Sequence, residues 1–197
     1  MRLLLTIIFL GLAGCVTQPA IKPAADSATH AQHLKSLDSI QAFNLKGRIA
    51  VNANGKGYSG SVSWAHQPNQ DSMDVFTPLG GKAAHIVKNA HEVSLTNAKG
   101  ETISAQSVEA LTEKTLGWRL PLSGLSDWAV GRPTAAPITH QAWDELGRLT
   151  QLEQQGWQIE YAQYIAYLNT VLPQKITLKN QNLQLRLVIE QWTPPSN

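Results

Sequence analysis

Alternating apolar and polar residues set the pattern of the chain from residue 43 onward. Over residues 43–51 the odd positions are apolar or glycine and the even positions are mostly polar, which is the period of a half-buried strand. Asn54-Gly55 supplies the positive backbone angles of a tight hairpin, and the alternation resumes over residues 58–64. The two segments are predicted to pair as antiparallel strands.

Further strands are predicted at hairpin spacing along the rest of the chain. Turn signals at residues 89–90 and 97–100 separate the early ones. The segments are residues 72–76, 82–88, 92–96, 101–104, 140–143, 147–154, 157–161, 174–179 and 183–190. Consecutive short strands joined by turns indicate a meander.

Three segments have helical spacing instead. Apolar residues recur at this spacing over residues 33–43, which predicts a short amphipathic helix packed on the domain. Residues 107–116 and 122–130 predict two more helices, which end at Gly117 and Gly131.

This order of elements predicts a mainly β fold with a few short helices. A single twisted antiparallel sheet of about ten strands rarely stays open and flat, so it is expected to curl into an incomplete (half) β-barrel. The helices are expected to cover its concave face as a lid. So little helix against so large a sheet predicts an unfilled hydrophobic cavity that can hold an apolar ligand.

The predicted cavity walls are the inward-facing apolar residues of the strands and the lid. The strand residues are Phe43, Leu45, Ile49, Val62, Trp64, Val75, Ile86, Leu185 and Leu187, and the lid residues are Leu111, Leu125 and Trp128. Because each of these types also fills an ordinary core, the prediction assigns them to a surface and not to individual ligand contacts.

The N-terminus carries a separate apolar run over residues 3–12, after the basic Arg2. The run is shorter than the roughly 20 residues that span a bilayer, and it ends in Leu12-Ala13-Gly14-Cys15, which is typical of a bacterial lipobox. Residues 1–14 are therefore expected to be a cleaved signal peptide, with Cys15 as the lipidated first residue of the mature protein. The alternative is an ordinary secretory signal with an incidental cysteine.

Cysteine usage agrees with a lipid anchor, because Cys15 is the only cysteine and no disulfide competes for it. Diacylglycerol and an N-acyl chain are the expected modifications, and two or three acyl chains anchor firmly because each buried methylene contributes about 0.8 kcal/mol. Residues 15–29 predict a flexible tether, and residues 30–197 a single domain. Val16 stands where aspartate retains many lipoproteins in the inner membrane, which favours the outer membrane.

Charge and motifs argue against two other classes of function. The formal net charge is +2, with no clustered basic face of the kind that binds nucleic acid. The six histidines lack zinc-ligand spacing, residues 57–60 lack the second glycine of a hydrolase elbow, and residues 54–57 lack the Gly-Lys-Ser/Thr of a phosphate loop. We expect no enzymatic activity, no metal and no cofactor.

Thr77-Pro78-Leu79-Gly80-Gly81 lies between two predicted strands. Its turn chemistry predicts a protruding loop with Leu79 exposed, which can dip into a lipid surface; the alternative is that Leu79 folds back onto the core.

One set of motif residues follows in a fixed order along the chain: Gly47, Val51, Tyr58, Trp64, Pro78-Leu79-Gly80, Leu120-Pro121-Leu122, Leu125, Trp128, Gly131 and Pro133. Together with the lipobox and the order of the strands, this set resembles the LolB family of outer-membrane lipoprotein receptors across essentially the whole mature chain. Two positions depart from the family pattern: Thr77 replaces an Asn-like residue, and Asp74 interrupts a more apolar strand.

The resemblance implies a LolA/LolB-like fold and a lipid-anchored protein that faces the periplasm. Such a receptor accepts lipoproteins from the periplasmic carrier LolA, shelters their acyl chains and inserts them into the inner leaflet of the outer membrane. The leucine matching Leu79, in the membrane-insertion loop formed by Pro78, Leu79 and Gly80, is needed for release of the cargo. The implied partners are LolA, acylated cargo and outer-membrane lipids, and the chain is expected to be a monomer.

An outer-membrane scaffold for an envelope assembly complex would have the same anchor and fold. A carrier is expected to have a continuous apolar hollow that opens near Leu79, whereas a scaffold is expected to have a filled core and an exposed patch elsewhere.

Overall fold

The strands form one open antiparallel sheet in the computed structural model, which describes residues 26–116 and 122–195. Within these ranges the sheet has 11 strands in the order β6-β5-β4-β3-β2-β1-β11-β10-β9-β8-β7. The strands are β1 (Phe43–Ala53), β2 (Lys56–Gln67), β3 (Gln70–Phe76), β4 (Lys82–Lys88), β5 (Val93–Asn97), β6 (Thr102–Ala105), β7 (Ile138–Trp143), β8 (Leu149–Gln154), β9 (Trp157–Tyr167), β10 (Thr170–Lys179) and β11 (Leu183–Thr193).

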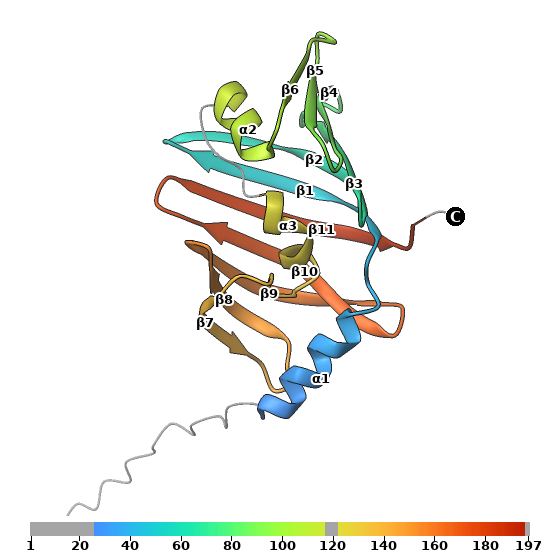
Figure 1. Ribbon diagram of the computed structural model, residues 1–197, viewed down its shortest axis with the longest axis vertical. Helices are drawn as coiled ribbons and strands as arrows, with labels where there is room; N and C mark the ends of the chain where they lie inside the picture. The colour runs from blue at the N-terminus through green and yellow to red at the C-terminus, as the bar shows by residue number, and fades with distance from the viewer. Residues whose placement is uncertain (1–25, 117–121, 196–197) are drawn as a thin grey trace, which may run out of the picture.

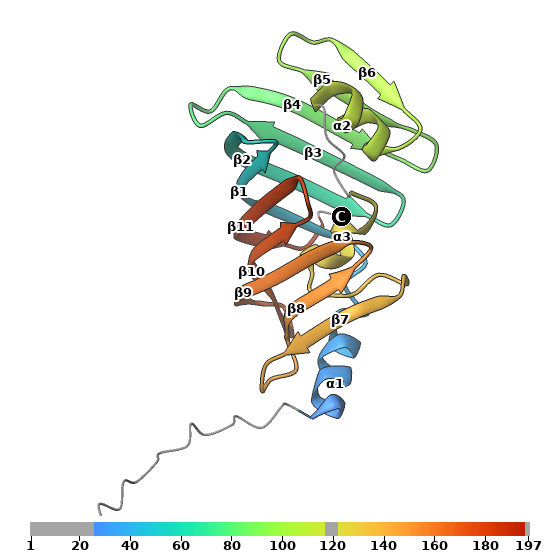
Figure 2. The ribbon, with the colours of Figure 1, turned by 90° about the vertical axis from the view of Figure 1, so that its left-hand side faces the viewer.

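Three helices accompany the sheet in the described residues: α1 (Ser27–Leu37), α2 (Val108–Leu116) and α3 (Leu122–Ala129). The sheet curls, with α2 and α3 on its concave side (Figures 1 and 2). The predicted half-barrel with a helical cover is confirmed, and so is the predicted meander.

The two halves of the sheet meet where β1 pairs with β11. All other pairings join strands that are consecutive in the sequence. Gly47 lies at a register shift opposite Ile189, and a Cβ at Gly47 would collide with the carbonyl oxygen of Val188. This position therefore accepts no side chain without a shift of the backbone.

The core follows the strand period of two. In each pair of neighbouring strands, an inward-facing residue of one strand lies opposite an inward-facing residue of the next. These residues form a continuous buried row across the sheet. The row runs Trp192, Leu45, Trp64, Met73, Ile86 and Leu95, all buried.

The hairpin between β9 and β10 is longer than the sequence predicted, since its strands extend to Tyr167 and from Thr170. Its turn contains no glycine; Leu168 takes the positive φ of 48° instead. Pro173 lies within β10 beside a register shift, and bulges of this kind are among the positions in a sheet that accept proline.

The first helix corrects two predicted boundaries. It spans Ser27–Leu37, so the tether predicted to reach residue 29 ends earlier, and the helix predicted over residues 33–43 begins and ends earlier. Asp26 caps it by accepting a hydrogen bond from the Ala28 amide at 3.2 Å. Residues 27–29 lack the apolar spacing from which the helix was predicted, so the start of α1 is determined by the Asp26 cap and not by the apolar pattern.

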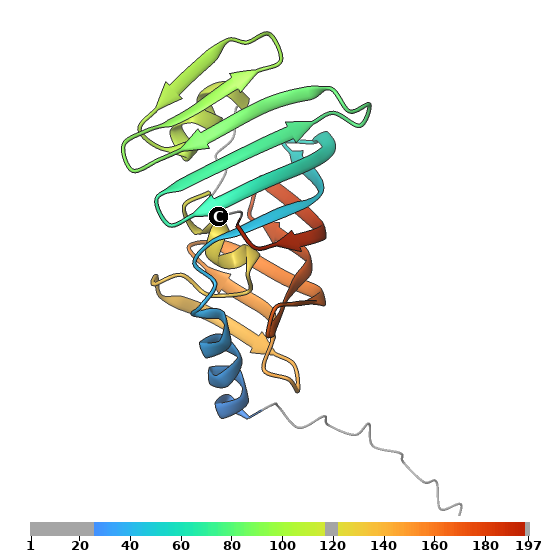
Figure 3. The same ribbon diagram turned by 90° about the vertical axis from the view of Figure 1, so that its right-hand side faces the viewer.

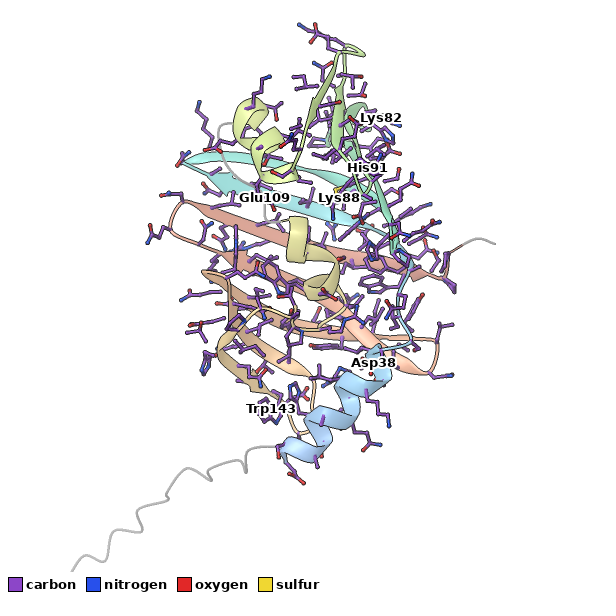
Figure 4. All side chains as sticks on the ribbon, viewed as in Figure 1. Asp38, Lys82, Lys88, His91, Glu109 and Trp143 are labelled. Atoms are coloured by element: carbon purple, nitrogen blue, oxygen red, sulfur yellow. The ribbon has the colours of Figure 1, made fainter. Side chains whose placement is uncertain are left out.

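Helix α1 lies against the β7 end of the sheet (Figures 3 and 4). The His30 ring stacks on Trp143 with centroids 4.3 Å apart, and its Nδ1 lies 2.7 Å from the Gly147 carbonyl oxygen. At the far end of the helix, Leu37 is completely buried. These contacts fix α1 against β7 and the turn that follows it.

The stability of this docked helix is expected to depend on pH through His33. Burial lowers the pKa of the His33 imidazole below its ordinary value, with His30 and Arg148 acting in the same direction and Asp144 opposing them. Because the pKa of His33 is lower in the folded than in the unfolded protein, neutral His33 favours folding. Its contribution to the free energy of unfolding is complete above the unfolded pKa of about 6.5 and is lost as the pH falls through the folded pKa. The free energy of unfolding in urea should therefore fall more steeply between pH 7 and pH 5 in the wild type than in His33→Gln. Parallel curves would contradict this assignment.

Candidate functional site

The concave face of the sheet, beneath α3, is the apolar surface that the sequence predicted. Side chains from the sheet and from α3 enclose a void of about 20 Å³, lined by Leu45, Ile49, Val62, Trp64, Met73, Leu125, Leu185 and Leu187. A void needs roughly 10–15 Å³ to hold one water molecule. The space is therefore apolar but no larger than a water or so.

Among the described residues, the void at this place is much smaller than the hollow expected from the sequence, whose full extent stays a prediction. Leu125 points from α3 into the sheet and is 5% exposed, and Trp128 one turn later is completely buried. These two side chains occupy volume that the strand residues alone would leave open. Leu79 is not among the residues that line the void.

The structure places the 12 predicted wall residues in several surroundings. Seven of them line the void, and Ile86 lines a neighbouring space of about 10 Å³ with Trp64 and Met73. Val75 packs at the edge of the core, and Leu111 is buried within it. Their role in binding a ligand stays a prediction. Met73 was missed, although its spacing of two from Val75 placed it on the same face.

An aromatic cluster occupies one end of the concave face. The Phe43 ring lies 5.1 Å from those of Trp64 and Trp192 and 4.9 Å from that of His66, centroid to centroid. Phe43, which was also predicted to line the cavity, lies in this cluster and does not line the void. Large rings packed edge to face make this end of the sheet well filled.

Asp71 gives the same end a polar border. Its Oδ1 accepts from Trp64 Nε1 at 2.9 Å and lies 2.6 Å from His66 Nδ1, and Lys88 lies 3.4 Å from Oδ2. Burial alone would raise the pKa of Asp71, but the hydrogen bonds from His66 and Trp64 outweigh it and lower the pKa. Asp71 is therefore a carboxylate that accepts three donors at the margin of the apolar face.

Helix α3 is held over the sheet by buried hydrogen bonds. Trp128 Nε1 donates to Gln154 Oε1 at 3.0 Å, and the Tyr161 hydroxyl donates to the Trp128 carbonyl at 3.1 Å. Burial raises the pKa of Tyr161 well above its usual value, which keeps the hydroxyl neutral and able to donate. These bonds hold the last turn of α3 in place.

Arg132 ties this region to α1. Its Nε donates to Asp127 Oδ1 at 2.8 Å, and its Nη1 donates to the Leu37 carbonyl at 2.9 Å. The Arg132 guanidinium therefore links α3 to the C-terminal end of α1.

The loop between β3 and β4 is tight and carries the most exposed leucine of the described residues. The Gly80 amide donates to the Thr77 carbonyl at 2.9 Å, and the Thr77 amide donates to the Gly81 carbonyl at 2.8 Å. Pro78 takes the second turn position, which proline favours, and Gly80 takes a φ of 86°. Leu79 is 98% exposed, so its predicted exposure is confirmed. The loop projects on the side of the sheet away from α2 and α3 (Figures 2 and 3).

Cys15, the predicted lipidation site, lies outside the described residues. None of the described helices is long and apolar enough to cross a bilayer. In residues 26–116 and 122–195, no group of three or more His, Cys, Asp or Glu side chains is placed to hold a metal ion.

The curved open sheet with helices on its concave face has the fold of the LolA superfamily. A LolA superfamily protein from Nitrosomonas europaea superposes with a TM-score of 0.55 at 8% identity, over 88% of this chain and 96% of that one. A DUF1329 family protein from Desulfovibrio piger gives a TM-score of 0.54 at 7% identity, over 88% and 95%. At these identities the likeness establishes the fold alone.

Sequence comparison is more specific. The family model described as "Outer membrane lipoprotein LolB" matches residues 41–192. Outer-membrane lipoprotein LolB of Nitrosococcus oceani is 37% identical over 183 residues, 92% of this chain and 91% of the relative. The protein of the same name from Pseudomonas aeruginosa is 34% identical over 184 residues, 93% and 90%. The chain belongs to the LolB family, as its motifs predicted.

Gln154 is expected to be essential to the position of α3. This side chain is 1% exposed; besides accepting from Trp128, it accepts from the Thr134 amide and donates to the carbonyls of Thr134 and Ala136. Gln154→Leu should destabilise the protein by about 2–4 kcal/mol, because it leaves several buried groups unpaired. The exposed Gln151 on the same strand provides the control, and urea unfolding of Gln151→Leu should differ little from the wild type. Equal loss in both variants would contradict the role of the buried amide.

Proposed function

We propose that this protein is an outer-membrane lipoprotein receptor. It accepts acylated lipoproteins from the periplasmic carrier LolA, shelters their acyl chains against the concave face of the sheet, and inserts them into the inner leaflet of the outer membrane. The observation that carries the proposal is an almost fully exposed leucine on a tight loop, next to an apolar half-barrel, in a chain of the LolB family.

Acyl chains can bind the concave face only after α3 moves. The void beneath it has room for about one water, while each methylene removed from water favours binding by about 0.8 kcal/mol. Displacement of Leu125 opens the space between Ile49 and Leu185, which both line the void. An incoming chain then replaces apolar contacts that α3 gives up, so acceptance needs no external energy source.

Delivery uses the Leu79 loop. A leucine at the tip of a loop, held by backbone hydrogen bonds and a proline, enters a bilayer without rearrangement of the fold. An acyl chain is more stable in the bilayer interior than in the protein cavity, because α3 can pack against the sheet again once the chain has left. Transfer therefore runs from the carrier, through the receptor, to the membrane.

Lipidation at Cys15 keeps the receptor at its target membrane. Diacylglycerol and an N-acyl chain on this residue would anchor it firmly, because one chain alone binds only weakly. The described chain begins with α1 at the β7 end of the sheet, so the anchor is joined to the end of the half-barrel distant from β6. The domain then faces the periplasm, where it meets its carrier as a monomer.

A scaffold for an envelope assembly complex is the second candidate. The small size of the void favours it, since a filled core needs no ligand. A scaffold does not bind a ligand in this void. Substitutions of the residues that line the void should therefore change cargo uptake only if the protein is a receptor.

Leu79→Glu should separate acceptance from delivery. A buried charge in the bilayer is unfavourable, so the variant of mature Cys15→Ala protein should take cargo from loaded LolA normally but transfer it to liposomes at least tenfold more slowly. Leu146→Glu, at another exposed turn leucine, is the control and should deliver normally. Failure of the parent protein itself to take cargo would favour the scaffold.

Leu125→Ala should enlarge the void and ease acceptance. We expect faster cargo uptake together with a loss of about 2–5 kcal/mol in unfolding free energy. Leu152→Ala is the matched control, because Leu152 is completely buried but does not line the void; it should lose similar stability without faster uptake. The same uptake rate in both variants would show that the void is not the binding site.

A further inference from the structure

The convex face of the sheet carries a basic groove beside the Leu79 loop. Its volume is about 500 Å³, and Arg48 of β1, Lys175 of β10 and Arg186 of β11 line it together with Pro78 of the loop. No carboxylate is among the described residues that line it. Acceptance of acyl chains on the concave face makes no use of this surface.

Strand register builds the groove. Lys175 and Arg48 both pair with Val188, and Arg48 also pairs with Ser61, so these residues form one row across the sheet. Arg186 lies in the adjacent row. The three cations therefore come from neighbouring strands on one face of a rigid sheet.

The floor of the groove is flat because small residues separate the cations. Ala50 pairs with Arg186 on one side and with Ser59 on the other. Ser59 and Ser61, which pair with Ala50 and Arg48, also line the groove, with Gly60 between them. Small side chains and available hydroxyl groups leave room for a compact anion between the basic side chains.

The charges of the groove are available to a ligand. Arg48 pairs with Glu190 at 2.8 Å, but both side chains are more than half exposed, at 69% and 54%. Such exposed pairs are weak and exchange partners readily. Arg186 is likewise exposed, so the groove has a surplus of positive charge.

The neighbouring loop identifies the kind of anion. Pro78 forms a wall of the groove, and the next residue is the exposed Leu79. Directly after the loop, Lys82 Nζ lies 5.9 Å from the centre of the Phe76 ring and forms an exposed ion pair with Asp74 at 2.7 Å. Cations around an apolar tip lie at headgroup depth when the tip enters lipid, whereas a soluble anion would not need the leucine.

We propose that the Arg48–Lys175–Arg186 groove binds the phosphate of an anionic phospholipid headgroup while Leu79 enters the bilayer. The groove then sets the orientation in which the receptor approaches the membrane, with its convex face toward the lipid. This inference rests on the proposed function, because it adds a headgroup site to the delivery step.

The test measures binding of mature Cys15→Ala protein to vesicles of phosphatidylethanolamine with one quarter phosphatidylglycerol. The triple variant Arg48→Gln/Lys175→Gln/Arg186→Gln should bind at least about tenfold more weakly than its parent. The control removes three exposed lysines outside the groove, Lys35→Gln/Lys56→Gln/Lys99→Gln, and should lose less than about threefold. Arg48→Lys/Arg186→Lys keeps the charge and should bind like the parent, which would show that the positive charge of the groove is what binds the vesicle.

Two outcomes would overturn the proposal. Equal weakening in the groove and control variants would mean that only net charge matters. Complete release from vesicles by 10 mM inorganic phosphate, at constant ionic strength, would identify a site for free phosphate and not for lipid.

The same variants separate this inference from the proposed function. The groove variant should take cargo from loaded LolA at the rate of its parent and deliver it more slowly. If the parent takes no cargo, the proposed function fails, while the vesicle comparison still decides whether the groove binds lipid.

Discussion

The pairing of β1 with β11 is the constraint on which the rest of the structure depends. Each half of the sheet is a meander of local hairpins, and without this pairing each would expose an apolar face and an unpaired edge. The register between them places Leu45 beside Trp192 and Leu185 beside Val51. One continuous concave face results, and the convex face gains its basic groove from the same alignment.

Local patterns predicted most of this fold. The strands were predicted from the alternation of apolar and polar side chains. The hairpin between β1 and β2 was predicted from its turn residues, Asn54 and Gly55, which both adopt a positive φ. The β9–β10 turn was missed because Leu168 adopts a positive φ that its residue type does not indicate. The start of α1 was missed because a single side chain, Asp26, determines it.

The site was harder to predict than the fold. The alternation assigned Ile49 and Leu187 to the concave face, but the size of the void depends on how deeply Leu125 enters it, which no local pattern contains. Gln154 is similar, since a glutamine at a strand end is usually exposed, whereas this one is buried and bonded to Trp128 of α3 and to residues 134 and 136. Interactions between distant segments decide both.

The central claim is that the concave face receives acyl chains, and photo-crosslinking tests it most directly. A photoreactive amino acid at Leu187, which lines the void and is not among the groove residues, is compared with one at Ala50, which lines the convex groove. With LolA carrying an acylated lipoprotein as donor, we predict that cargo crosslinks through its acyl chains to position 187 and not to position 50. Equal crosslinking at both positions, or none at 187 while cargo still leaves the donor, would contradict this claim.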